Sequence, residues 1–300
     1  MLTPGTNDRS GKQIAETGTS GYFTAASLSP DGSRLAAEVG IPGASGFNIW
    51  VSDLARGIPT RLTFSSVIDA APAWSPDGKT IAFVSDRSGQ LHLYQRAADG
   101  TGSILLLVVD NAEEDNPSFS SDGRYLIFER LASASGSHAE IWALPLFGDR
   151  KTFPVVQDPQ FDLSGPAVSP DVKWLAYSSH QSGLPEIYVV PFGKGTGRRE
   201  VANGRGGGGI KPRWRHDGRE LFFLSLDNKL MSAEISEQGT SLVVGNVAPL
   251  FQANPVFSAH GHWPYDVSAD GKKFVVAAQS VQKTTEPLTL VTNWPALLKK

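Results

Sequence analysis

The stretch APAWSPDGKTIAFVSDRSGQ, residues 71–90, contains the tetrapeptide Ser75-Pro76-Asp77-Gly78 between two apolar segments. Proline presets the backbone φ for the second position of a type I turn, and aspartate suits the third position. Glycine accepts the positive φ that closes a hairpin. The stretch therefore predicts two antiparallel strands, roughly residues 70–75 and 80–85, joined by a tight turn.

The tetrapeptide recurs along the 300-residue chain, intact at residues 29–32 and in altered form as SSDG, SPDV, RHDG and SADG. Apolar residues also recur three positions before and four and six positions after each aspartate. Successive copies are 45 to 53 residues apart, which is the sequence signature of a repeat architecture. We expect the aspartates to have a structural role in six equivalent turns: Asp31, Asp77, Asp122, Asp171, Asp217 and Asp270.

A third strand follows each hairpin, as at Glu186-Ile187-Tyr188, and a fourth, as at residues 60–64, ends the unit. Four short strands repeated at this spacing are typical of a β-propeller blade. We therefore expect residues 1–300 to form one all-β domain, a six-bladed β-propeller of four-stranded antiparallel blades. The blades are expected at residues 22–64, 69–109, 114–156, 163–203, 210–251 and 263–293.

The two ends of the chain are expected to close this ring. The last copy supplies three strands, the third at residues 288–293, and residues 11–18 match the fourth-strand pattern. An N-terminal strand beside residues 288–293 would complete the last blade and leave no open sheet edge.

The fourth copy of the turn carries Val172 where the intact copies have glycine. A β-branched residue is strained at positive φ. We therefore expect a different turn there, with a negative φ at Val172.

Composition excludes several classes of protein. Lys and Arg number 27 against 30 Asp and Glu, so no overall basic field exists to hold nucleic acid or an anionic membrane. Cysteine is absent, which excludes disulfides, thiolate zinc sites and a cysteine nucleophile. The longest aliphatic run, residues 104–109, is far shorter than the ~20 residues of a membrane-spanning helix. We expect no membrane insertion, and the first residues contain no targeting signal.

Catalytic motifs are weak or missing. Residues 204–209 match GxGxxG, but Pro212 follows where a phosphate-binding loop needs a helix, so a flexible loop is expected. His260 and His262 would need a third ligand for a metal site, and no histidine spacing recurs between copies. No GxSxG nucleophile motif occurs. We expect no catalytic residue, no metal and no cofactor.

The copy at residues 75–94, with SPDG, SDRSG and Leu-x-Leu-Tyr, resembles the WD-like repeat of the six-bladed TolB propeller. Segments at residues 8–13, 49–57, 212–224 and 293–300 resemble most closely the C-terminal propellers of membrane-anchored bacterial serine/threonine kinases, typical of acidobacterial genomes. The resemblance implies the fold, and a sensor or docking role in an extracytoplasmic, periplasmic setting; outside such a protein the chain would be cytoplasmic. No kinase motif occurs in this chain.

These observations favour a non-catalytic propeller that binds a protein or peptide partner as a monomer. Loops between second and third strands and between blades differ in length and sequence, so they are expected to carry recognition. The candidate binding residues are Asp86, Arg87, Glu129, Arg130, His180, Arg205, His260 and His262. Two alternatives stay open: a propeller enzyme such as a metal-dependent lyase or hydrolase, and the gating domain of a prolyl-oligopeptidase-type peptidase.

Overall fold

A computed structural model describes residues 5–10, 13–16, 22–40, 46–108, 111–131, 138–193, 199–201, 208–239, 241–257 and 261–277. Within these ranges the chain forms strands and turns without a helix, so the all-β prediction is confirmed. Accordingly, no helix in the described part is long and apolar enough to cross a bilayer.

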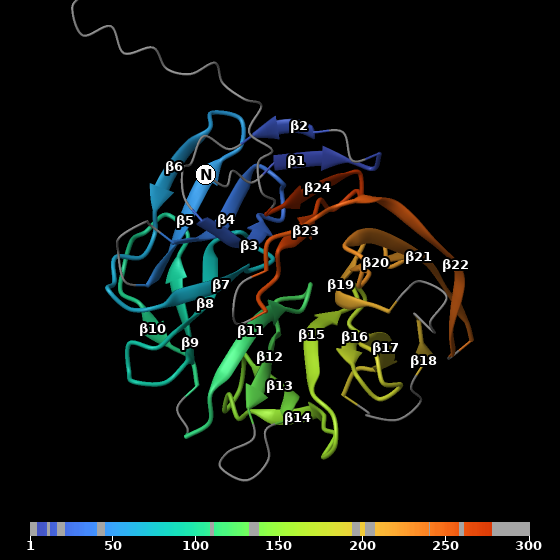
Figure 1. The fold of residues 1–300 in the computed structure, drawn as a ribbon. Coiled ribbons are helices and arrows are strands. Elements are labelled where there is room, and N and C mark those ends of the chain that lie inside the picture. Colours follow the sequence, from blue (N-terminus) through green and yellow to red (C-terminus); the bar gives the residue numbers. More distant parts are fainter. Residues whose placement is uncertain are drawn as a thin grey trace, which may run out of the picture.

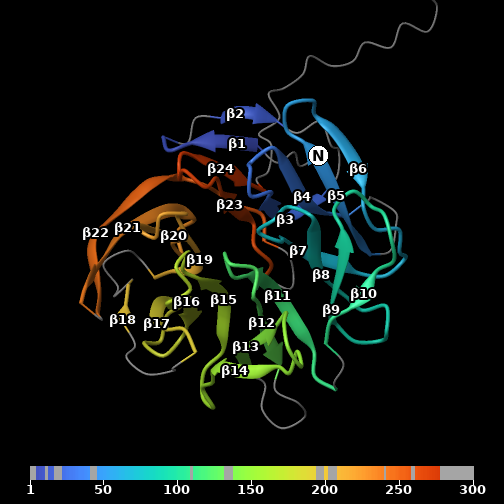
Figure 2. The ribbon, with the colours of Figure 1, turned by 180° about the vertical axis from the view of Figure 1, so that it is seen from behind.

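The strands form antiparallel four-stranded sheets around a common centre, seen from opposite sides in Figures 1 and 2. The first sheet contains β3 (Tyr22–Leu28), β4 (Arg34–Gly40), β5 (Phe47–Asp53) and β6 (Ile58–Arg61). The second contains β7 (Asp69–Trp74), β8 (Thr80–Ser85), β9 (His92–Ala97) and β10 (Leu105–Leu106). The third contains β11 (Glu114–Phe119), β12 (Tyr125–Leu131), β13 (Ala139–Pro145) and β14 (Phe153–Val156).

Two further sheets follow the same order along the chain. The fourth contains β15 (Leu163–Val168), β16 (Trp174–Ser179), β17 (Glu186–Pro191) and β18 (Arg199–Glu200). The fifth contains β19 (Ile210–Trp214), β20 (Glu220–Leu224), β21 (Lys229–Gln238) and β22 (Ser241–Gln252). Apolar clusters fill the space between neighbouring sheets, as where Ile49 of β5 packs with Trp74 and Phe83 of the second sheet.

The sixth sheet joins both ends of the chain, in the order β2-β1-β24-β23 (Figure 1). It contains β1 (Gly5–Asp8), β2 (Gln13–Glu16), β23 (Tyr265–Val267) and β24 (Lys273–Val276). Beside β24 the third position of this sheet is occupied by β1, and β2 pairs with β1 in the fourth position. The predicted pairing of the N-terminal strand with residues 288–293 stays a prediction. Residues 288–293 lie outside the described residues.

The strand in the third position belongs to a hairpin that the sequence pattern does not reveal. Residues 5–8 read GTND and carry no apolar alternation, so nothing marks them as a strand. The hairpin is held in place at its turn, where Arg9 Nη2 lies 2.7 Å from Glu220 Oε1 and Arg9 Nη1 donates to the Gly271 carbonyl. The N-terminus therefore supplies two strands of the sixth sheet instead of one.

The repeated turns are built as hydrogen-bonded loops around the aspartate. In the second sheet, Ser75 Oγ donates to Asp77 Oδ1 at 2.6 Å, and the Lys79 N–H donates to the same oxygen at 3.0 Å. Gly78 has a φ of 67°, and its N–H donates to the Ser75 carbonyl.

The expectation of a negative φ at Val172 is wrong, since its φ is 60°. The turn keeps the same bonds, because Ser169 Oγ donates to Asp171 Oδ1 and the Val172 N–H donates to the Ser169 carbonyl. The half-buried valine side chain packs against the same apolar cluster as Tyr125 and Phe153 of the third sheet. This apolar contact offsets the cost of left-handed backbone, so sequence copies of the turn with and without glycine share one geometry.

A second local feature precedes the recurrent prolines. Ala71, Asn116, Gly165 and Lys211 all have positive φ, and each stands before a proline at a break in the register between first and second strands. These are β-bulges, which re-aim the backbone of the strand. Their N–H groups reach the preceding sheets: Ala71 donates to Glu38 Oε2 and Gly165 to Glu129 Oε1.

Candidate functional site

The first strands of all six sheets surround one central cavity of about 310 Å³. It is lined by residues from each of them, among them Leu28, Trp74, Phe119, Val168, Arg213 and Asp266. The cavity opens beside the repeated turns, since Ser29, Ser120 and Ser268 also line it.

His262 lies between two carboxylates near the centre. Its Nδ1 is 2.7 Å from Glu38 Oε2 and its Nε2 is 3.2 Å from Asp115 Oδ1, with 1% of its side chain exposed. Burial by itself would lower the pKa of His262, but the charges of Asp115 and Glu38 outweigh it and raise this pKa to about 10. The imidazolium in turn holds the pKa of Asp115 low against the opposing effect of burial. The group is therefore an ion triad at neutral pH.

Two further buried pairs continue this network. Glu129 Oε1 accepts the Gly165 N–H at 2.6 Å and lies 3.9 Å from Lys211 Nζ. Burial raises the pKa of Glu129 and lowers the pKa of Lys211, in each case more than the partner's charge opposes it. Asp266 accepts the Leu28 N–H at 2.7 Å, and its Oδ1 lies 3.3 Å from Arg213 Nε.

We call these side chains the channel network: Glu38, Asp115, Glu129, Lys211, Arg213, His262 and Asp266. They come from the first, third, fifth and sixth sheets, except for His262, which lies in the connection before β23. Bulge N–H groups of the second and fourth sheets donate to Glu38 and Glu129. Each charged side chain lies within 3.9 Å of an oppositely charged one, so the network links these parts of the molecule by polar contacts. In the described part of the chain, no group of three or more His, Asp or Glu is arranged to hold a metal.

A pocket of about 430 Å³ lies between the second and third sheets, beside the loop from β8 to β9. Apolar Ile68, Leu91 and Leu131 line part of it. Apart from Gly89 and Gln90, the remaining lining residues are acidic, and no lysine or arginine is among the described residues that line the pocket. We call it the acidic pocket; its carboxylates are Asp86, Glu113, Glu114, Asp115 and Glu129.

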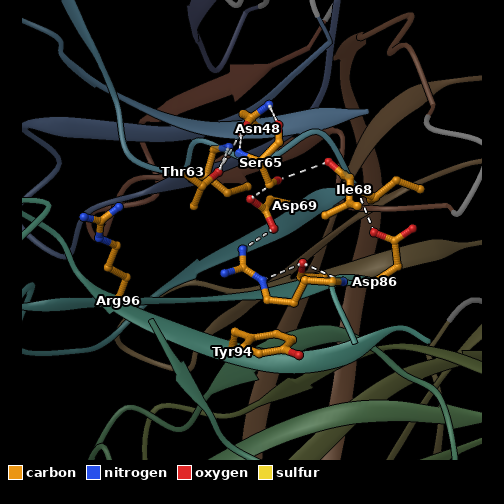
Figure 3. A network of polar contacts seen from close by, with 12 residues as sticks. Asn48, Thr63, Ser65, Ile68, Asp69, Asp86, Tyr94 and Arg96 are labelled. Carbon is orange, nitrogen blue, oxygen red and sulfur yellow. Dashed lines mark hydrogen bonds and ion pairs between the residues drawn. The ribbon is translucent and has the colours of Figure 1, made fainter. Parts of the chain in front are cut away.

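Arg87 binds to a polar network between the first and second sheets, whose members Asn48, Ser65 and Asp69 are labelled in Figure 3. Its Nη2 lies 2.6 Å from Oδ1 of Asp69, whose side chain is fully buried. Asp69 Oδ2 accepts the Ser65 hydroxyl at 2.7 Å, and Asn48 Oδ1 accepts the Ser65 N–H. The Arg87 guanidinium also lies 4.9 Å from the centre of the Tyr94 ring. Arg87 therefore makes its contacts within the second sheet, and it is linked to Asn48 of the first sheet through Asp69 and Ser65.

The structure places the other predicted binding residues in different settings. Glu129 and His262 come together in the channel network, and Glu129 also meets Asp86 in the acidic pocket. Asp86 Oδ1 accepts the Ile68 N–H at 2.8 Å. Arg130 lies over the Trp142 ring at 4.2 Å, and His180 is exposed. The two remaining candidates, Arg205 and His260, lie outside the described residues.

Sequence reasoning missed Glu38, Lys211, Arg213 and Asp266 as parts of one site. A signal was present, because Glu38 is a charged residue within the otherwise apolar strand RLAAEVG. It also stands at the same repeat position as Glu129, seven residues after the turn aspartate. Such an interruption indicates a buried charge, but it does not reveal the partner.

Comparison with known proteins shows which proteins this chain is similar to. Residues 7–140 match the TolB beta propeller domain. The uncharacterized protein Atu1656 of Agrobacterium fabrum is 37% identical over 79 residues, 25% of this chain and 26% of that protein. The chain spans about a quarter of the length of the curated relatives it matches.

Solved structures share the fold at low sequence identity. One assigned to TolB of Agrobacterium tumefaciens has a TM-score of 0.69 at 17% identity, over 92% of this chain and 96% of that one. An oligogalacturonate lyase in complex with manganese has a TM-score of 0.61 at 17% identity, over 94% and 79%. The sequence match over residues 7–140 and the shared architecture together support a TolB-like β-propeller.

Proposed function

We propose that this chain is a non-catalytic binding propeller that docks a protein or peptide partner through one face. That face, called here the variable-loop face, consists of the loops between second and third strands and the connections between sheets. The observation that carries the proposal is the acidic pocket of about 430 Å³, which opens on this face. Its carboxylates stand on strand ends, where a rigid scaffold holds recognition groups in place.

The rigidity follows from a closed ring of six blades, which is part of the proposal. Support comes from the sixth sheet, whose strands derive from both chain ends. Support also comes from its contact with the first sheet, where the Ala26 N–H donates to the Trp263 carbonyl and Phe23 packs in one cluster with Val275. Closure removes free sheet edges and limits relative movement of the loops.

The charge of the pocket indicates the chemistry of the partner. Asp115 and Glu129 are already compensated by His262 and Lys211 in the channel network. Asp86 and Glu113 lie nearer the rim and are partly exposed. A peptide segment carrying lysine or arginine would complement this rim, and rim charges act chiefly on encounter and selectivity. The resemblance to kinase-linked propellers supports a sensor role in an extracytoplasmic setting, which belongs to the same proposal.

A peptide array with varied basic content tests the proposal. We expect the purified chain to select peptides with Lys or Arg, and Asp86→Asn with Glu113→Gln to weaken the best peptide about tenfold. Asn at position 86 keeps the oxygen that accepts the Ile68 N–H. The matched control removes two exposed charges elsewhere, Asp149→Asn with Glu234→Gln. Equal losses in both double variants, or no preference for basic peptides, would refute the proposal.

The alternative of a metal-dependent lyase or hydrolase is supported only by a shared fold. It is tested directly by metal analysis of the purified chain. A stoichiometric metal, together with turnover that is lost when the metal is removed and restored when it is added back, would replace the binding proposal by an enzymatic one.

A further inference from the structure

A second pocket, of about 470 Å³, lies between the first and second sheets at the opposite end from the acidic pocket. It is bounded by the turn between β5 and β6 and by the turn after β9. We call it the arginine pocket, since its charged lining residues are Arg34, Arg56, Arg61 and Arg96 with Asp53 and Asp99. We propose that it binds the phosphate group of a small organic phosphate monoester.

The charge of the arginine pocket is not balanced by the protein. Among the described residues, the ion pairs join other groups, and none includes any of these four guanidinium groups. The two aspartates accept hydrogen bonds from groups in their own turns. Asp53 Oδ1 accepts the Ala55 and Arg56 N–H groups at 2.9 Å each, and Asp99 Oδ1 accepts both the N–H and the hydroxyl of Thr101. The pocket thus has two positive charges in excess, which matches a phosphate monoester near its dianionic form.

Three of the guanidinium groups are held in place by contacts that leave some of their N–H donors unused. Arg34 lies 4.5 Å from the centre of the Trp74 ring and donates Nη2 to the Gly78 carbonyl. Arg61 lies 5.0 Å from the centre of the Phe64 ring and donates Nε to the Thr63 carbonyl. Arg96 donates to the carbonyls of Leu62 and Gly100. Each guanidinium has five N–H donors, so groups that are already positioned retain hydrogens for an anion.

Arg96 is also distinct from the polar network nearby. Figure 3 shows it on the opposite side of Asp69 from Asp86. Arg96 donates its hydrogen bonds to backbone carbonyls, which carry no net charge, so these bonds do not neutralise the positive charge of the guanidinium. Positioned arginines that form no ion pair with a carboxylate are suited to phosphate, whose several oxygens can each accept from a different guanidinium.

The rim of the pocket indicates an organic group next to the phosphate. Ile58 and Phe64 line the pocket and are 58% and 71% exposed. Apolar side chains this exposed beside four arginines suit a ring or short carbon chain. A volume of about 470 Å³ is in the range of small-molecule sites.

Calorimetric titration with phenyl phosphate at low ionic strength tests the proposal. The variant is Arg56→Gln with Arg61→Gln, chosen because Arg56 is exposed and Arg61 is partly exposed. We expect saturable binding to the unmodified chain and a loss of at least ~10-fold in affinity in this variant. The control, Arg150→Gln with Lys151→Gln, removes two exposed cations from the third sheet and should bind within ~2-fold of the unmodified chain.

Three further probes define the ligand. Inorganic phosphate should bind more weakly, because it lacks the ring, and benzoate should bind more weakly, because it carries one charge. A peptide containing phosphotyrosine should bind no better than phenyl phosphate if the natural ligand is a small molecule. Absence of saturable binding, equal losses in both double variants, or tighter binding of the peptide would each overturn the proposal. Melting temperatures of the variants, expected to equal that of the unmodified chain, exclude unfolding as the cause.

Discussion

Replacing His262 by glutamine should strongly destabilise the chain, because it removes the cation that Glu38 and Asp115 share. Both carboxylates are within 3.2 Å of the imidazole, and the His262 side chain is 1% exposed. Removing one partner of a buried pair typically costs about 3–5 kcal/mol, since the remaining charge is left buried without compensation. Equilibrium unfolding in denaturant at neutral pH measures this cost directly.

The same variant should change how stability depends on pH. The pKa of His262 is raised from 6.5 to about 10 in the folded chain, so between these values the folded chain holds a proton that the unfolded chain has released. The stabilisation due to His262 is therefore complete below pH 6.5 and is lost as the pH rises towards 10. The slope approaches about 1.4 kcal/mol per pH unit within that interval.

Neighbouring groups with shifted pKa values also make stability depend on pH, so the unmodified chain has to be compared with the variant. Lys211 titrates with a lowered pKa, which makes stability rise with pH and opposes the effect of His262. Glu129, whose pKa is raised, acts in the same direction as His262 at lower pH. The difference between unmodified chain and variant isolates the histidine. Parallel pH profiles, or a loss below about 1 kcal/mol at neutral pH, would refute the ion triad.

Other substitutions probe the turns and the N-terminal hairpin. Gly78→Val should cost about 1–3 kcal/mol in denaturant unfolding, because the φ of 67° is strained for valine and no apolar cluster is there to receive it. Val172→Gly should change the free energy of unfolding by less than about 1 kcal/mol, since relief of backbone strain offsets the lost packing; a larger loss of stability would mean that packing dominates. Arg9→Ala should lower stability by about 1 kcal/mol through its contact with Glu220, whereas an unchanged midpoint would show that the hairpin is held by β-pairing alone. A chain beginning at residue 17 should lose far more stability than Arg9→Ala. It should also leave the edge of β24 unpaired and prone to aggregation, which light scattering measures.

The repeated turns could be read from the sequence because their chemistry is local. Serine, aspartate and glycine within four residues satisfy one another, as the bonds of Asp77 to Ser75 and Lys79 illustrate. Turn chemistry and the alternating apolar residues around it were therefore enough to predict all-β, four-stranded antiparallel sheets. The variable-loop face could be predicted only as a region, because the sequence shows only that these loops differ from one copy of the repeat to the next.

Only the tertiary structure decided the rest, because the deciding contacts join residues far apart in the chain. His262 meets Glu38 across 224 positions, and no local pattern encodes that pairing. The β1–β24 pairing depends on a polar segment that packs only when the sixth sheet is assembled. Val172 adopts a positive φ where its side chain packs against an apolar cluster formed by the third and fourth sheets. The arginine pocket likewise gathers Arg34, Arg61 and Arg96 from three strands, so its charge becomes visible only when the first two sheets stand side by side.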